Sequence, residues 1–282
     1  MRHQNSVFYE MLKQVPMDAL ERLVGLHGAD DRQRGFDTKS HLVALLYAQL
    51  AGASSLREIE AGLQSHCSLL YHLGATRVRR STLADANRLR PAAVFADLFG
   101  RLLQQAHRGL RRSLAETTYL IDSTGVRLSG RAAEWARFSA KACGAKVHVV
   151  YDPDADRPVY AAVTAARVND ITAAQAMPIE AGATYVFDLG YYDYRWWAAL
   201  DAAGCRIVTR FKANTPLTGV VERDVAEAGN ILSDRIGRLP PRQAASRHNP
   251  FDKPVREVRV RIETGKVLRI LSNDLDATAQ EI

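Results

Sequence analysis

Apolar residues recur at helical spacing in the first third of the chain. Residues 39–51 carry leucines three and four positions apart, and Gly52 interrupts this pattern. Ser55 begins a second segment with Glu58 three positions later, which is the spacing of a capping box. We therefore expect two helices joined by a glycine turn. This outline is typical of a helix-turn-helix, whose second helix enters a DNA major groove, but any small helical bundle shares it.

An arginine-rich segment follows these helices. Its charged residues are Arg77, Arg79, Arg80, Arg88 and Arg90, opposed by Asp85. We expect a helix to start at Ser81–Thr82, and residues 93–105 have the pattern of an amphipathic helix. Arginine binds phosphate through two parallel donors. The candidate contacts to a nucleic-acid backbone are Arg77, Arg79, Arg80 and Arg88; a solvated basic face is the alternative.

From about residue 117 the periodicity becomes that of β-strands. Five segments are β-prone: 117–121, 146–151, 159–163, 184–187 and 206–211. Turn-forming residues at 152–158 should join the second and third as a hairpin. We expect helices over 171–177, capped by Asp170, and over 194–203. This order predicts a mixed α/β fold in which helices cover a sheet.

Composition and charge narrow the class of protein. The chain has 282 residues, of which 47% are hydrophobic and 24% charged, as in soluble globular proteins of up to two domains. A net charge of +7 favours a polyanionic partner such as nucleic acid. The separated Cys67, Cys143 and Cys205 predict buried, reduced thiols without a zinc site or disulfide. Without an apolar signal core or membrane-length apolar run, we expect a cytoplasmic protein.

Two aspartates stand where an apolar strand is expected to become a loop. Asp122 follows the expected strand 117–121, and Asp188 follows 184–187. Functional groups gather at the carboxyl ends of parallel strands, so the two carboxylates would face each other if these strands are neighbours. Paired carboxylates bind hard cations such as Mg²⁺, and two such ions assist phosphoryl transfer. The alternative is that each aspartate caps a turn or a helix.

Other residues allow a structural and a functional interpretation. Arg210 and Lys212, after the fifth expected strand, can bind phosphates or form a solvated strand end. Trp196 and Trp197 can stack on bases, but their helical spacing favours a place in the core for at least one. His148 lacks a partner at metal-ligand spacing, which favours a structural histidine.

Several motifs resemble those of bacterial insertion-sequence transposases of the DDE class. Ile121-Asp-Ser-Thr and Asp188-Leu-Gly-Tyr-Tyr-Asp-Tyr-Arg-Trp-Trp resemble the first and second acidic motifs of the branch marked by a Tyr-Arg-Glu-Lys signature, insertion-sequence group four. Three further segments resemble the N-terminal helical domain of that branch: Arg34-Gly-Phe-Asp-Thr, Ser55-Leu-Arg-Glu-Ile and Arg80-Ser-Thr-Leu-Ala-Asp-Ala-Asn. Its fifth strand is resembled by Val208-Thr-Arg-Phe-Lys-Ala-Asn.

The resemblance implies a domain plan. It comprises an N-terminal helical domain over 1–75 that can bind DNA, a basic connector over 76–115, and an RNase H-like catalytic domain over 116–282 with a mixed five-stranded sheet. A β-rich insertion should occupy about 213–271. Within it, alternation over 255–263 and 266–271 predicts a hairpin with arginines on one face.

The resemblance also implies a chemistry. A two-metal site of Mg²⁺ or Mn²⁺, bound by Asp122 and Asp188, would hydrolyse phosphodiester bonds and transfer DNA strands. The partners would be double-stranded DNA, as terminal inverted repeats and target, and further copies of the chain.

The chain departs from the family pattern at the third carboxylate, which the family carries on a helix. Glu281 lacks the accompanying tyrosine and arginine, and we expect Glu222, Glu257 and Glu263 at the surface. We therefore expect this carboxylate to be missing from the chain, through truncation. Two alternatives stay open: an inactive DNA-binding remnant of a transposase, and a metal-dependent nuclease of the same fold.

Overall fold

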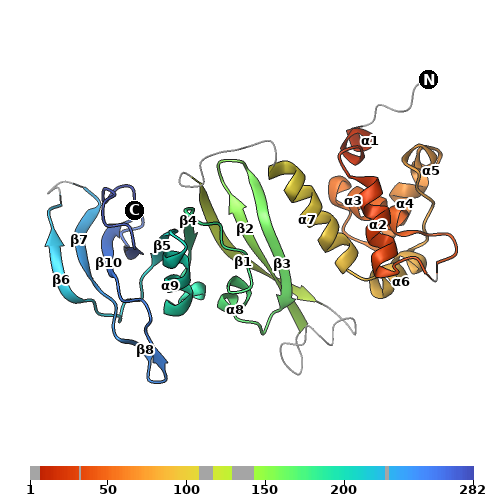
Figure 1. The fold of residues 1–282 in the computed structure, drawn as a ribbon. Coiled ribbons are helices and arrows are strands. Elements are labelled where there is room, and N and C mark those ends of the chain that lie inside the picture. The colour runs from red at the N-terminus through yellow and green to blue at the C-terminus, as the bar shows by residue number, and fades with distance from the viewer. Residues whose placement is uncertain (1–6, 32, 108–116, 129–142, 226–228) are drawn as a thin grey trace. The chain divides into compact units, whose positions relative to one another are not determined.

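The computed structural model describes residues 7–31, 33–107, 117–128, 143–225 and 229–282 (Figure 1). The chain forms two compact units, residues 1–110 and 111–282. The first unit is helical and the second is built around a sheet, so the expected change from helices to strands near residue 117 is confirmed. No helix in the described ranges combines the length and apolarity needed to cross a bilayer.

The first unit consists of short helices. They are α1 (Val7–Leu12), α2 (Met17–His27), α3 (Thr38–Ala51), α4 (Leu56–Ser65), α5 (Cys67–Leu70), the 3₁₀ turn η1 (Tyr71–Leu73), α6 (Arg80–Leu89) and α7 (Ala93–His107). Helix α3 ends at Gly52, whose φ of +65° lies in the left-handed region that favours glycine. The expected pair of helices with a glycine turn is confirmed; its contact with DNA stays a prediction.

The cap of α4 differs in detail from the expected capping box. Ser55 Oγ accepts a hydrogen bond from Glu58 N at 3.3 Å, as expected. The Glu58 carboxylate, however, accepts from Ser54 N at 2.8 Å, one residue earlier than in a capping box. Both ends of the connection are thus tied to the first turn of α4, which fixes the angle at which the chain enters the helix.

Arg90 does not belong to the basic surface that the arginine-rich segment suggested. It is buried at 7% exposure, and its guanidinium donates to the Phe36 carbonyl and lies 3.5 Å from Asp30 Oδ1. A buried guanidinium must be paired to offset its desolvation. Arg90 therefore links α6 to the loop before α3 within the helical unit.

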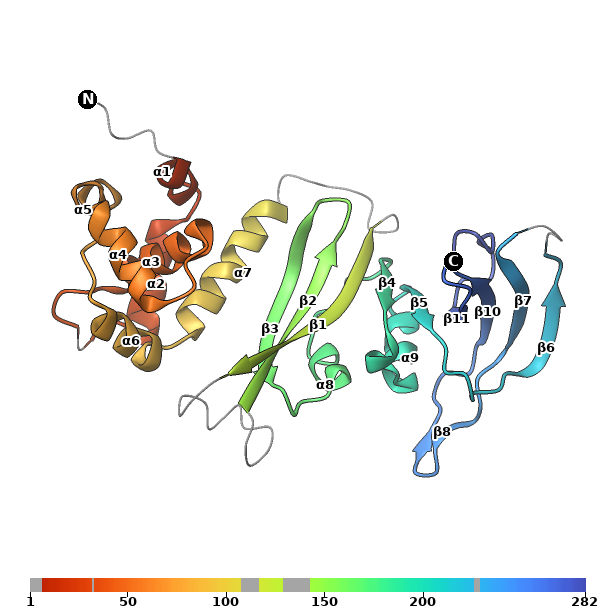
Figure 2. The ribbon, with the colours of Figure 1, turned by 180° about the vertical axis from the view of Figure 1, so that it is seen from behind.

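The second unit contains a nine-stranded sheet of order β3-β2-β1-β4-β5-β11-β10-β7-β6 (Figure 2). Its strands are β1 (Thr118–Leu128), β2 (Cys143–Asp152), β3 (Arg157–Ala165), β4 (Thr184–Phe187), β5 (Arg206–Arg210), β6 (Thr218–Arg223), β7 (Ile231–Arg238), β10 (Pro254–Arg261) and β11 (Val267–Ser272). β1, β4 and β5 are parallel, whereas β2 and β3 add in antiparallel fashion. The mixed α/β class and all five expected strands are confirmed.

One face of this sheet carries the core. Helices α8 (Asp170–Ala174) and α9 (Tyr194–Ala202) pack with Tyr119, Ile121, Tyr185, Phe187 and Ile207 in one buried cluster. Because side chains alternate along a strand, Leu120 and Asp122 belong to the opposite face. Trp196 and Trp197 are both buried in the cluster. The favoured interpretation, a place in the core, is confirmed, and the alternative of base stacking is wrong for both.

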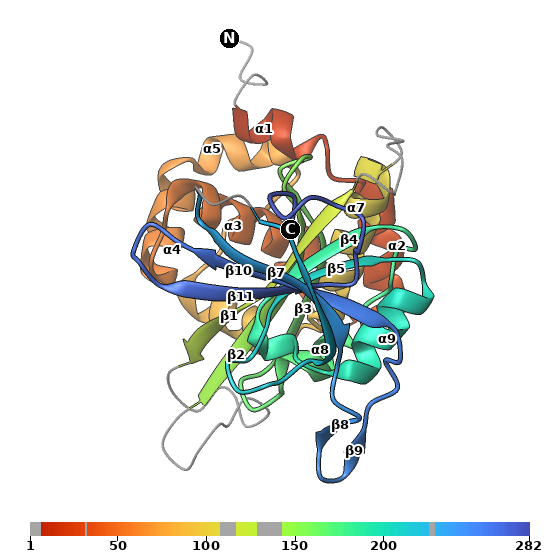
Figure 3. The ribbon, with the colours of Figure 1, turned by 90° about the vertical axis from the view of Figure 1, so that its left-hand side faces the viewer.

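The expected β-rich insertion continues the same sheet. β11 pairs with β5, from Ile270↔Arg210 to Ser272↔Val208, and β10 pairs with both β11 and β7. A small hairpin of β8 (Arg242–Ala244) and β9 (Arg247–His248) projects away from it (Figure 3). The insertion is therefore joined to the core sheet through backbone hydrogen bonds.

The arginines of this insertion do not share one exposed face, which corrects the sequence-based expectation. Arg256 is buried and donates to both carboxylate oxygens of Asp234, at 2.7 and 2.6 Å. Alternation identifies the two faces of a strand but not an ion pair formed with the neighbouring strand. Here β7 supplies the acid that allows an arginine to be buried.

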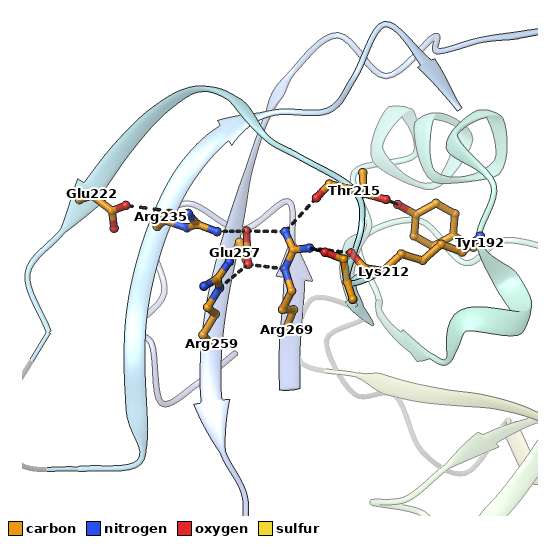
Figure 4. Close-up of polar contacts among 9 residues, drawn as sticks. Tyr192, Lys212, Thr215, Glu222, Arg235, Glu257, Arg259 and Arg269 are labelled. Carbon is orange, nitrogen blue, oxygen red and sulfur yellow. Dashed lines mark hydrogen bonds and ion pairs between the residues drawn. The ribbon is translucent and has the colours of Figure 1, made fainter. Parts of the chain in front are cut away.

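Glu257 is likewise not a surface residue, as we had expected, but is 0% exposed. Its carboxylate accepts hydrogen bonds from Arg269 Nε at 2.6 Å, Arg235 Nη2 at 2.8 Å and Arg259 Nε at 3.1 Å (Figure 4). Burial alone would raise the pKa of Glu257, but hydrogen bonds from Arg269 and Arg259 and the charges of Arg269 and Arg235 lower it. Three arginines thus hold this carboxylate ionised between β7, β10 and β11.

We expect Glu257→Gln to lower the free energy of unfolding by about 3 kcal/mol, because it leaves three arginines without their shared anion. Urea denaturation followed by tryptophan fluorescence measures this loss. The matched control is Glu263→Gln on the exposed hairpin turn, which should change stability by less than about 0.5 kcal/mol. Equal midpoints for the two variants would contradict a stabilising role for the buried network.

The contribution of Glu257 should also depend on pH. Because its folded-state pKa lies below the unfolded value of about 4.3, its stabilisation is complete above that value and is lost as pH falls through the folded-state pKa. The difference in unfolding free energy between the parent and Glu257→Gln should be constant above about pH 6 and shrink below about pH 4. Urea titrations at several pH values test this; a difference that persists unchanged in acid would contradict it.

Candidate active site beside the parallel strands

Asp122 and Asp188 occupy matched positions on neighbouring parallel strands. β1 and β4 pair in register from Thr118↔Thr184 to Ile121↔Phe187. Asp122 and Asp188 directly follow the two residues of the last pair. Adjacent strands lie roughly 4.8 Å apart, and both side chains are exposed. The condition set by the sequence, that the two strands be parallel neighbours, is met.

The expectation that Asp122 ends its strand was wrong. β1 continues to Leu128, but beyond Ile121 it pairs only with β2, from Asp122↔Val149 to Leu128↔Cys143. Asp122 therefore lies where β4 leaves the sheet while β1 goes on. The open position beside it arises because the neighbouring strand is short.

Local hydrogen bonds orient each carboxylate. Ser123 N donates to Asp122 Oδ1 at 2.7 Å, and Gly190 N donates to Asp188 Oδ1 at 2.8 Å. Asp188 is thereby also the cap of the 3₁₀ turn η4 (Leu189–Tyr191). Asp188 therefore caps a turn, as the alternative interpretation expected, and also lies beside Asp122. The two roles are compatible, because an exposed carboxylate has more acceptor positions than one cap uses.

Asp170 is a third carboxylate at this place, and sequence reasoning assigned it only a helix cap. The N-cap of α8 is Asn169, without a side-chain cap bond. Asp170 Oδ1 instead accepts from Ser123 Oγ at 2.8 Å and from Lys146 Nζ at 3.0 Å. Partial burial alone would raise the pKa of Asp170, but the hydrogen bonds from Lys146 and Ser123 lower it.

Two buried polar groups face this cluster. The pKa of Tyr191 is raised, first by burial and then by the charges of Asp170, Asp122 and Asp188. Its hydroxyl has no hydrogen-bond partner of normal geometry among the described residues. His148 donates or accepts through Nε2 with Thr164 at 2.8 Å, and its Nδ1 lies 3.8 Å from Asp170 Oδ1.

His148 fits the structural interpretation better than that of a metal ligand. It is 1% exposed, and burial lowers its pKa. Across the described ranges, no group of three or more histidine, cysteine or acidic side chains is arranged to hold a metal ion. The cysteines described are all free thiols; Cys205 is buried, whereas Cys67 and Cys143 are only partly so.

The other glutamates weighed for a third carboxylate lie apart from the two strand positions in the sheet order. Glu222 is on the edge strand β6, and Glu263 is in the β10–β11 turn. Glu281 accepts hydrogen bonds from Thr278, its own neighbour in sequence. Glu257 is neutralised by arginines. The described partners of Glu222 and Glu257 are arginines of neighbouring strands, and that of Glu281 is Thr278.

The basic candidates occupy both units. Arg210 is exposed at the end of β5, and Lys212 Nζ lies 4.2 Å from the centre of the Tyr192 ring. In the helical unit, the arginines at the start of α6 are exposed: Arg77, Arg79 and Arg80. Arg88 is exposed but pairs with Asp85 at 3.0 Å, a contact that contributes little in water. These side chains are accessible to phosphate groups.

Comparison with known proteins connects this geometry to a family. Residues 113–281, which include both aspartates, match the family described as a transposase DDE domain, and residues 3–76 match a domain of unknown function, DUF4372. A putative transposase y4zB of Sinorhizobium fredii (strain NBRC 101917 / NGR234) is 40% identical over 192 residues, covering 68% of this chain and 54% of that protein.

Two further matches are more distant. A probable transposase for insertion sequence element IS5377 of Geobacillus stearothermophilus is 24% identical over 219 residues, covering 74% of this chain and 55% of that protein. A cryo-EM structure of the piggyBac transposase synaptic complex with hairpin DNA aligns with a TM-score of 0.48 and 11% identity, over 95% of this chain and 59% of that one. The chain spans about half the length of the curated relatives it matches.

Gly190 separates two of the carboxylates, and we expect Gly190→Ala to destabilise the fold by roughly 1 kcal/mol. A Cβ there would lie 3.0 Å from Asp188 Oδ1 and 3.1 Å from Asp170 Oδ2, tighter than ordinary contact. Gly125→Ala, in β1 with open space around it, is the matched control and should be neutral or slightly stabilising. Thermal unfolding of both variants tests this; a neutral Gly190→Ala would mean that the two carboxylates are not held in place.

Proposed function

This chain belongs to the family of transposases with a DDE domain, and from that premise we propose that it forms part of an insertion-sequence transposase that cleaves and transfers DNA strands. The observation that carries the proposal is the parallel register of β1 and β4, which brings Asp122 and Asp188 to neighbouring positions. We further propose that the second unit is RNase H-like and that the chain belongs to the branch with the Tyr-Arg-Glu-Lys signature.

The donor set at these positions suits a hard divalent cation. Both groups are carboxylates on exposed side chains, and oxygen ligands are those that Mg²⁺ and Mn²⁺ prefer. Asp122 and Asp188 would hold the metal. When bound, a pair of such ions supplies activation of the attacking oxygen and stabilisation of the leaving oxygen in an in-line displacement.

The chain's own residues orient this site and bind the substrate. The backbone amides of Ser123 and Gly190 fix one oxygen of each aspartate. Arg210, the last residue of the next parallel strand β5, and Lys212, two residues later, are proposed to bind backbone phosphates of the DNA being cut. Arg77, Arg79, Arg80 and Arg88 are proposed to bind DNA through the helical unit, with affinity that falls as salt rises.

The finer assignments are proposals of the same kind. The DNA bound is expected to be the terminal inverted repeats of an element and its target, held by a homo-oligomer at the bacterial nucleoid. The third carboxylate is not supplied by Glu222, Glu257, Glu263 or Glu281, because each is engaged or placed away from the aspartates. The activity of the chain by itself is therefore expected to be low.

Asp122→Asn and Asp188→Asn should each reduce metal-dependent DNA cleavage by at least about 100-fold while leaving DNA binding intact. Loss of a residue that only supports a metal ligand costs up to about 100-fold, and loss of a ligand itself should cost at least as much. Nicking of supercoiled plasmid with Mg²⁺ or Mn²⁺, beside a gel-shift assay, measures both. Asp276→Asn, an exposed aspartate near the end of the same unit, is the matched control.

Cleavage retained by both asparagine variants would refute the active-site assignment. A parent chain that binds DNA but cleaves with neither metal supports the DNA-binding remnant instead. Cleavage of DNA without any joining of ends to a target would favour the nuclease.

A further inference from the structure

Asp170 contacts the segments of both proposed metal-binding aspartates. Its Oδ1 accepts a hydrogen bond from Ser123 Oγ, and the backbone amide of the same serine donates to Asp122 Oδ1. Its Oδ2 lies 3.1 Å from the position that a Cβ on Gly190 would take, and the Gly190 amide donates to Asp188 Oδ1. One side chain of α8 thus hydrogen-bonds to β1 and lies close to the turn η4.

Asp170 lies on the opposite side of β1 from Asp122, since it hydrogen-bonds to Ser123. Ser123 follows Asp122 on β1, so by alternation its side chain belongs to the face covered by α8, whereas Asp122 belongs to the other face. Asp122, Asp170 and Asp188 do not form a three-carboxylate group arranged to hold a metal ion among the described residues. Asp170 can determine where the strand carrying Asp122 and the turn carrying Asp188 lie.

The surroundings of Asp170 depend on its negative charge. Lys146 Nζ, 3.0 Å away, uses the carboxylate as its counterion, with a second bond to the Val168 carbonyl at 3.2 Å. The Nδ1 of buried His148 lies 3.8 Å from Asp170 Oδ1 and has no hydrogen-bond partner among the described residues. Without Asp170, the positive charge of Lys146 would stand unpaired.

We propose that Asp170 is a positioning residue of the two-aspartate site, acting on Asp122 through Ser123 and on Asp188 through Gly190. This inference rests on the proposed function, because it assumes that the two aspartates bind a divalent cation. Outer partners that hold metal ligands typically alter affinity by about 10- to 100-fold when removed. Asp170 fits that description through its hydrogen bond to Ser123 and its charge.

Titration of the full chain with Mn²⁺, followed by the electron paramagnetic resonance signal of the free ion, tests the proposal without relying on activity. Asp170→Asn keeps the shape but removes the charge, and should weaken Mn²⁺ binding by about tenfold. Asp276→Asn makes the same charge change at an exposed site and should not alter binding. Thermal unfolding identifies any variant that fails to fold, and circular dichroism checks its secondary structure.

Ser123→Ala separates a positioning effect from a charge effect. It should weaken Mn²⁺ binding by a few-fold in the parent chain and by nothing further in an Asp170→Ala background, because Ser123 is held through Asp170. If cleavage is measurable, the Asp170→Asn variant should need about ten times more Mn²⁺ for half-maximal rate and recover most of that rate at saturation.

The outcomes separate the inference from its premise. If Asp122→Asn and Asp188→Asn bind Mn²⁺ as the parent does, the proposed site fails and Asp170 has nothing to position. If those two variants lose binding while Asp170→Asn and Ser123→Ala both match Asp276→Asn, the proposed function stands and the positioning role is overturned. Additive losses from Ser123→Ala and Asp170→Ala would equally contradict the link between them.

Discussion

The ladder between β1 and β4 is only four residue pairs long, yet it brings both Asp122 and Asp188 to the candidate site. Side chains alternate along a strand, so a slip of one residue would turn Asp122 toward the helix-covered face. Tyr119 and Ile121 prevent this slip, because their burial beside Tyr185 and Phe187 fixes which face of β1 is inward. The exposed position of Asp122 follows from the apolar residues before it.

An aromatic cluster fixes the turn that carries Asp188. The Phe187 ring lies 4.9 Å from that of Trp196, and Trp197 Nε1 donates to the Tyr191 carbonyl at 3.1 Å. Both contacts join β4 and η4 to α9. Since Asp188 lies between Phe187 and this turn, the packing of α9 limits how far its backbone can move. The two tryptophans of the second acidic motif thus support the site from the core.

The sequence predicted the strands and both strand-end aspartates because those signals are local. Alternation, turn formers and an apolar run before Asp188 are read within ten residues of each other. The role of Asp170 could not be predicted, since its partners Ser123 and Lys146 lie 47 and 24 positions away in the chain. Sequence assigned the aspartate to the helix start beside it, which is where an isolated Asp before Ile171 belongs.

Buried charges were missed for a related reason. Charged side chains are rarely buried unless they are paired, so Arg90, Arg256 and Glu257 were all assigned to the surface or to a basic face. Each has its partner on a different element, respectively Asp30, Asp234 and the arginines of β7 and β11. For Arg256 and Glu257, the pairing of β10 with β7 supplies Asp234 and Arg235, and that pairing was not predicted, although the hairpin of β10 with β11 was.

The insertion is connected to the half of the sheet that carries Asp122 and Asp188 by the same buried network. Arg269, held by Glu257, also donates to the carbonyls of Lys212, Ala213 and Thr215, at 2.6, 2.7 and 3.0 Å (Figure 4). These carbonyls form the loop that leaves β5, the parallel strand beside β4. A single guanidinium therefore fixes the backbone of Lys212, and Tyr192 holds its ammonium group by a cation–π contact. Since Glu257 is what keeps Arg269 in place, the insertion orients a basic residue of the core sheet through one buried carboxylate.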